Sequence, residues 1–161
     1  MKLLNARRAV TLAAATVLAA AGAVTLAQPA DAATVHCGGW TNYQKTVEGV
    51  NGEIHVPTTS TSSDNTNCSL WPGDTGNGVK ALQAALRYCW GQSLGSSGID
   101  GSYGSHTQTA VENVQRELNQ DQGAGLTVDG KWGPQTRRYT EYPLFHYNST
   151  TVYTELECTF P

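Results

Sequence analysis

One short phrase occurs twice in this chain and constrains its fold more than any other feature. Residues 99–107 read Ile-Asp-Gly-Ser-Tyr-Gly-Ser-His-Thr, and residues 128–136 read Val-Asp-Gly-Lys-Trp-Gly-Pro-Gln-Thr, 29 positions later. Each copy has an apolar residue, an Asp-Gly pair, a free position, an aromatic residue, a Gly, two free positions and a Thr. Agreement at so many coupled positions indicates an internal repeat of one supersecondary unit.

The chemistry of the phrase predicts a joint between a loop and a helix. Asp can hydrogen-bond its own downstream backbone and the following Gly tolerates a positive φ, so the pair forms a tight turn. We expect the aromatic residue to anchor the loop, the second Gly to let the chain turn into a helix, and the Thr to lie in its first turn. The positions are Asp100, Gly101, Tyr103, Gly104 and Thr107 in the first copy, and Asp129, Gly130, Trp132, Gly133 and Thr136 in the second.

Helical periodicity surrounds the two copies. Apolar residues recur at helical spacing within Asn77–Trp90 and within Ser105–Asn119, which predicts two amphipathic helices. A third, shorter helix is expected to begin at Pro134, because proline is favoured at the first helical position, and to end before Pro143.

The flanks of this helical part carry weaker strand signals. Glu53–Val56, ended by Pro57, reads as a short strand, and Val152–Phe160 alternates apolar and polar residues with the period of a half-buried strand. The polar stretch Thr58–Thr66 is expected to form an exposed loop. The predicted fold class is therefore mainly α: a three-helix bundle with short terminal β-strands and two disulfides.

The first 32 residues have the pattern of a secretory signal peptide. A basic head is followed by the apolar stretch Ala9–Leu26 and by the small-residue cleavage pattern Ala30–Ala32. Cleavage before Ala33 would leave seven basic and 12 acidic residues, a net charge of about −5. A mildly acidic exported chain without a basic cluster is not expected to bind nucleic acid, nor to stay in the membrane after cleavage.

All four cysteines follow the predicted signal segment. An even count in an oxidising compartment predicts two disulfides, and the residues are too far apart in sequence for a typical zinc site. Three pairings are possible. The favoured one joins Cys68 to Cys89, bracing the start of the helical part, and Cys37 to Cys158, tying the two ends together.

The pattern of the helical part resembles the three-helix peptidoglycan-binding domain of bacterial wall hydrolases. The resemblance covers about Leu70–Tyr142. Besides the two copies of the phrase, the residues that carry it are Gly73–Val79, Leu82, Gln83, Leu86, Ala110, Val111 and Gln115. The resemblance implies a noncatalytic module that attaches a secreted protein to cell-wall peptidoglycan.

This resemblance divides the chain into four predicted parts. A signal peptide (1–32) precedes an N-terminal arm (33–69), and the peptidoglycan-binding-like domain (70–143) precedes a C-terminal strand extension (144–161). The predicted location is extracellular or on the cell wall.

Four side chains are candidates for contact with the ligand. Gln83 and Gln115 hold matching polar positions on the first two predicted helices, where they could bond peptide or amide groups of a wall fragment. Tyr103 and Trp132 have aromatic faces that could stack on sugars. The alternative is structural, with the glutamines packed against the turns and the aromatic residues buried.

The sequence offers no pattern of an enzyme, a metal site or a cofactor site. The four histidines form no paired cluster of the kind a zinc peptidase needs, and each cysteine has a potential disulfide partner. The residues before Asp100 and Asp129 lack the alternating oxygen ligands of a calcium loop. The alternative to wall binding is a disulfide-stapled interaction or inhibitor protein, which presents the loop Thr58–Thr66 to a secreted protein partner.

Overall fold

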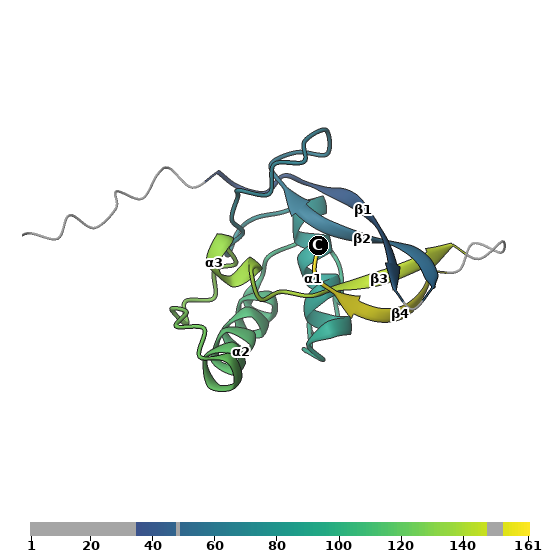
Figure 1. The fold of residues 1–161 in the computed structure, drawn as a ribbon. Coiled ribbons are helices and arrows are strands. Elements are labelled where there is room, and N and C mark those ends of the chain that lie inside the picture. Colours follow the sequence, from purple (N-terminus) through teal and green to yellow (C-terminus); the bar gives the residue numbers. More distant parts are fainter. Residues whose placement is uncertain (1–34, 48, 148–152) are drawn as a thin grey trace, which may run out of the picture. The chain divides into compact units, whose positions relative to one another are not determined.

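The computed structural model describes residues 35–47, 49–147 and 153–161, so the predicted signal segment lies outside the described residues (Figure 1). The elements follow in the order β1 (Gly39–Val47), β2 (Val50–Thr58), α1 (Asn77–Ala84), η1 (Ala85–Cys89, π-helical), α2 (Ser105–Gln122), α3 (Pro134–Arg137), β3 (Tyr142–Tyr147) and β4 (Tyr153–Thr159). None of the helices in these ranges is long and apolar enough to cross a membrane.

The strands form a four-stranded antiparallel sheet in the order β1-β2-β3-β4. The predicted fold class, mainly α, was therefore wrong. β1 and β3 were not anticipated, because β1 is largely polar and β3 contains Pro143, which was expected only to limit a helix. Pro57 likewise does not end β2 but lies within it, opposite Trp40. Strand pairing between distant segments leaves little trace in local sequence.

The two faces of the sheet differ in what covers them. α1 and η1 lie against one face, which we call the inner face (Figure 1). Ile54, Val56 and Leu144 point to it and are at most 1% exposed. Because successive side chains of a strand alternate between faces, residues such as His55 and Phe145 belong to the opposite, outer face.

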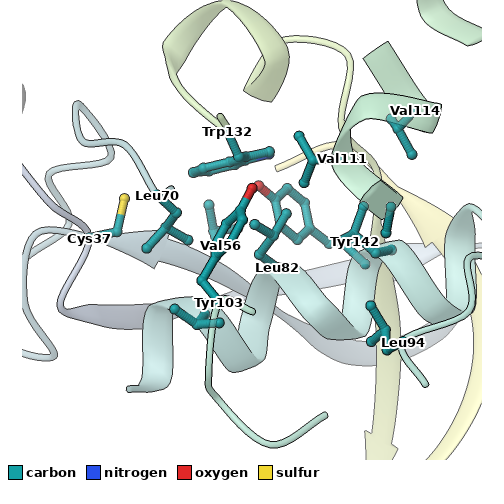
Figure 2. Close-up of a cluster of buried hydrophobic side chains, with 14 of the residues drawn as sticks. Cys37, Val56, Leu70, Leu82, Leu94, Tyr103, Val111, Val114, Trp132 and Tyr142 are labelled. Atoms are coloured by element: carbon teal, nitrogen blue, oxygen red, sulfur yellow. The ribbon is translucent and has the colours of Figure 1, made fainter. Parts of the chain in front are cut away.

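The core joins the sheet to the helices. Figure 2 shows the rings of Tyr103 and Tyr142 with the indole of Trp132 in one cluster of buried side chains. Tyr142 begins β3, whereas the other two rings come from the two copies of the phrase. All three are at most 2% exposed, so the repeated phrase supplies the centre of the core.

The predicted helices are present, with altered ends. α1 and η1 together span 77–89, close to the predicted 77–90, but the last turn is π-helical. α2 extends to Gln122, where Gly123 terminates it with a φ of 60°. α3 begins at Pro134 as predicted and lasts only four residues, because the chain soon enters β3.

The disulfides join Cys37 to Cys68 and Cys89 to Cys158, so the favoured pairing was wrong. The backbone N–H of Cys37 donates to the Ser69 carbonyl, and the N–H of Ser69 donates to the Val35 carbonyl, which brings the segment before β1 beside the segment before α1. Cys89 ends η1, which packs against β4, the strand that contains Cys158. Each cysteine therefore meets a partner that tertiary packing places beside it.

Candidate functional site

In the first copy, one glutamine holds the whole loop. The Oδ1 atom of Asp100 accepts the backbone N–H of Ser102 at 2.8 Å, and Gly101 has a φ of 80°. Gln83 reaches in from α1: its Nε2 donates to Asp100 Oδ1 at 2.9 Å, to the Ser102 carbonyl at 3.1 Å and to Thr107 Oγ1 at 3.1 Å. Its Oε1 accepts the N–H of Gly101 at 2.8 Å. Asp100 and Gly101 therefore form a tight turn.

The second copy repeats this arrangement one helix later. Gln115 of α2 donates through Nε2 to Asp129 Oδ1 at 3.1 Å, to the Lys131 carbonyl at 2.9 Å and to Thr136 Oγ1 at 3.4 Å. Its Oε1 accepts the N–H groups of Asp129 and Gly130 at 3.1 and 3.0 Å. We call Gln83 and Gln115, each with the loop it holds, glutamine clamps.

The clamps place the two glutamines in the interior. Gln83 and Gln115 are each 1% exposed, and both ends of each amide are hydrogen-bonded within the domain. A buried amide must have partners, and here the loops provide them. In the structure both glutamines pack against the turns, the arrangement that the sequence offered as an alternative to ligand contact.

The aromatic residues of the phrase are buried as well, and they have different hydrogen-bond partners within the protein. The hydroxyl of Tyr103 donates to the carbonyl of Gly130 at 2.8 Å, which links the first copy to the second. The indole Nε1 of Trp132 donates to Thr140 Oγ1 at 3.1 Å, just beyond α3. Burial raises the pKa of Tyr103, so its hydroxyl stays protonated and donates. Neither ring has a face turned to solvent.

The second glycine of the phrase has another role than expected. Gly104 and Gly133 precede their helices with φ values of −89° and −130°, which other residues also adopt. A side chain at Gly133 would lie 3.0 Å from Ser69 Oγ, so close packing explains that glycine. Gly104 has open space around it, and nothing in the structure explains it.

A strap formed by residues 69–76 passes over both copies. Leu70 exchanges two backbone hydrogen bonds with Trp132, at 2.7 and 2.8 Å. Further along, Gly73 donates to Tyr103, and Gly76 donates to Gly101. This strap, which includes Gly73 and Gly76, therefore holds the two joints beside each other.

A hollow of about 320 Å³ opens on the surface next to η1. It is lined by Arg87, Gly91, Gln92, Ser93, Leu94 and Gly95. Sequence reasoning missed this site, although Gly91 and Gly95, with φ values of 59° and 69°, mark a tight loop. Asn113 of α2 donates to Gln92 at 3.0 Å and fixes this loop, whereas the Arg87 side chain is exposed.

The remaining polar groups do not assemble into a metal site within the described ranges. No three His, Cys, Asp or Glu side chains of these residues lie close enough together to hold an ion. Asp100 is exposed, and its pKa is lowered, first by the hydrogen bond from Gln83 and then by the Ser102 N–H. Its carboxylate therefore stays ionised as part of the turn.

Comparison with known proteins connects this geometry to one family. Residues 75–138 match the family model described as a putative peptidoglycan binding domain, a range that includes both clamps. An N-acetylmuramoyl-L-alanine amidase, CwlL, of Bacillus licheniformis is 38% identical over 102 residues, covering 61% of this chain and 26% of the relative. A probable N-acetylmuramoyl-L-alanine amidase of the same organism is 35% identical over 100 residues, with 60% and 26% coverage. The chain thus spans about a quarter of these relatives. No solved structure matches significantly.

Proposed function

We propose that this chain is a noncatalytic module that binds bacterial cell-wall peptidoglycan, because residues 75–138 match the model of a putative peptidoglycan binding domain. The observation that carries the proposal is the family match, which spans both glutamine clamps. The relatives named as amidases share only about a quarter of their length with the chain. We therefore extend to it the binding domain and not the amidase activity.

We further propose that the module acts outside the cell. Cys37–Cys68 and Cys89–Cys158 are closed disulfides, which persist in oxidising, extracytoplasmic compartments. The predicted signal peptide, 1–32, supports export by an independent argument from sequence.

The hollow beside η1 is our proposed place of contact with the wall. The clamp glutamines and the aromatic residues of the phrase are interior, so a ligand must meet other groups. The hollow offers the guanidinium of Arg87 and the polar loop 91–95. A guanidinium pairs well with carboxylates, which the peptide stems of peptidoglycan carry. The hollow also adjoins a π-helical turn, a feature often found at functional sites.

A pelleting assay tests both the proposed binding to peptidoglycan and the proposed contact at the hollow. The purified chain is incubated with insoluble peptidoglycan, and the bound fraction is measured by sedimentation beside an unrelated control protein. Losing a charge-assisted hydrogen bond predicts that Arg87→Ala weakens binding about tenfold. Arg138→Ala, which removes another exposed arginine away from the hollow, serves as the matched control and should bind like the parent chain.

Each contrary result has a distinct meaning. If the chain is not enriched over the control protein, the proposed function is wrong. Equal binding by the Arg87 variant and the parent chain would contradict the proposed contact site alone. Release of soluble fragments from the wall by the purified chain would contradict the noncatalytic assignment.

A further inference from the structure

A row of aromatic rings crosses the outer face of the sheet, outside the residues that match the family model. The rings of Trp40 in β1 and His55 in β2 stack with centroids 4.7 Å apart and planes 8° from parallel. His55 in turn lies 5.1 Å from the ring of Phe145 in β3. All three side chains are partly exposed, so the row spans three strands and still meets solvent.

A buried carboxylate accompanies this row. The Glu53 side chain is 5% exposed, although its position in β2 places it on the outer face, opposite Phe145. Its Oε2 accepts the side-chain amides of Asn42 and Gln44, each at 3.3 Å, and its Oε1 lies 3.1 Å from His55 Nε2. Burying a carboxylate is costly unless it is well bonded, so this network fixes the positions of the surrounding side chains.

The charge of the outer face restricts what could bind there. Its described side chains include no lysine or arginine; among them are Trp40, Asn42, Gln44, Thr46, Asn51, Glu53, His55 and Phe145. Without cations, this face has no electrostatic attraction for nucleic acid or another polyanion. A neutral, polar polymer suits it better.

The shape and chemistry of the face match a sugar chain. Asn42 and Gln44 are exposed, and their bonds to Glu53 engage only the amide nitrogens, which leaves the carbonyl oxygens as acceptors for hydroxyl groups. Aromatic surfaces pack well against the C–H groups of sugar rings. Pre-positioned side chains also lower the ordering cost of binding.

We propose that the outer face of the sheet is a second binding surface, which takes the neutral sugar backbone of the wall polymer, a chain of N-acetylated amino sugars. The proposal rests on the proposed function for the source of this polymer. The outer face would contact the sugar chain, and the hollow beside η1 would contact the peptide stems. Two sites on one polymer would raise the overall affinity through effective concentration.

A soluble oligosaccharide that lacks peptides tests this surface separately. The full chain is titrated with the β-1,4-linked hexamer of N-acetylglucosamine, and binding is followed by calorimetry and by the NMR signals of the His55 ring. We expect saturable binding that weakens at least tenfold in Trp40→Ala and severalfold in Asn42→Ala. Trp71→Ala is the matched control: this partly exposed tryptophan packs on His36, at a centroid distance of 3.8 Å, and its loss should leave hexamer binding unchanged.

The results separate this proposal from the proposed function. Absence of saturable hexamer binding would overturn the outer-face proposal, as would equal binding by Trp40→Ala, Asn42→Ala and the parent chain. Asn42 is exposed, so its variant still reports if Trp40→Ala does not fold. Hexamer binding that persists in Arg87→Ala and is lost in Trp40→Ala would support a site distinct from the hollow. Pelleting with whole peptidoglycan but no hexamer binding would leave the proposed function standing and remove this surface.

Discussion

The clamp region and the sheet of this protein are built in opposite ways. In the clamp region, Gln83 holds a loop that begins 17 positions later, and Gln115 holds one that begins 14 positions later. In the sheet, β2 pairs with β3, which lies more than 80 residues further along the chain. The first region is specified by a short phrase used twice, and the second depends on pairing between distant segments.

The difference extends to how polar groups are used. In the clamp region, polar side chains such as Gln83 and Thr107 turn inward and complete the backbone hydrogen bonds of the loops. On the outer face of the sheet, Asn42 and Gln44 gather around Glu53 and stay exposed. The comparison teaches that a polar residue within a repeated motif need not be functional, whereas an unrepeated cluster on a strand face deserves a test.

The largest expected effect comes from cutting the link between the two regions. Cys89 of η1 and Cys158 of β4 are 69 positions apart, so their disulfide restricts a long loop in the unfolded chain. We expect Cys89→Ala/Cys158→Ala to lower the free energy of unfolding by about 4 kcal/mol. Urea denaturation measures it. Cys37→Ala/Cys68→Ala removes a disulfide between residues only 31 positions apart, so it should lower the free energy of unfolding somewhat less. The reverse order would contradict this dependence on the length of the closed loop.

The second largest expected effect comes from breaking either glutamine clamp. Gln83→Leu leaves the buried N–H of Gly101 without its acceptor, and Gln115→Leu does the same to Asp129 and Gly130. Each variant should lose about 3 kcal/mol of unfolding free energy, with the larger loss for Gln115→Leu. Gln120→Leu, on the exposed side of α2, is the control in the same denaturation series and should change little. Equal stability of all three variants would refute the clamps as determinants of the fold.

The smallest effect is a pH dependence within the first clamp. The pKa of Asp100 is lowered in the folded state, chiefly by the hydrogen bond from Gln83 and then by the Ser102 N–H. A lowered folded pKa means that the ionised carboxylate stabilises the fold above the unfolded pKa of about 3.9, and that this contribution disappears as pH falls through the folded value. Asp100→Asn keeps the acceptor oxygen and removes the titration.

Urea midpoints measured between about pH 2 and pH 6 test that dependence. The parent chain should lose stability on acidification in the lower part of this range, and Asp100→Asn should lose less. Asp121→Asn, which removes an exposed carboxylate at the end of α2, controls for the change in net charge. Parallel curves for Asp100→Asn and the parent chain would contradict the assignment.

The sequence predicted the features that depend on local contacts and missed those that depend on contacts between distant segments. The helix starts at Asn77, Ser105 and Pro134 were predictable, because caps, turns and apolar spacing act over a few residues. The turns at Asp100 and Asp129 followed from the chemistry of Asp-Gly. The disulfide partners were not predictable, because spacing along the chain does not say which cysteines the fold brings together.

The features of the candidate site also differ in how far the sequence alone could predict them. The sequence identified Gln83 and Gln115 as matched positions and left two roles open, and their burial and hydrogen bonds are visible only in the structure. Apart from the glycines of the loop 91–95, it gave no sign of the hollow beside η1, since a π-helical turn and this loop form it together. The row of Trp40, His55 and Phe145 joins three strands, so no single segment contains its pattern.

The sequence by itself determined the repeated joint, the helix starts and the match of residues 75–138 to the family model, because hydrogen bonds within a turn and apolar spacing along a helix are properties of neighbouring residues. Only the tertiary structure decided the four-stranded sheet, the disulfide pairs and the burial of the clamp glutamines. These features depend on which distant segments meet, and that choice is made by packing of the whole chain rather than by any one part of it.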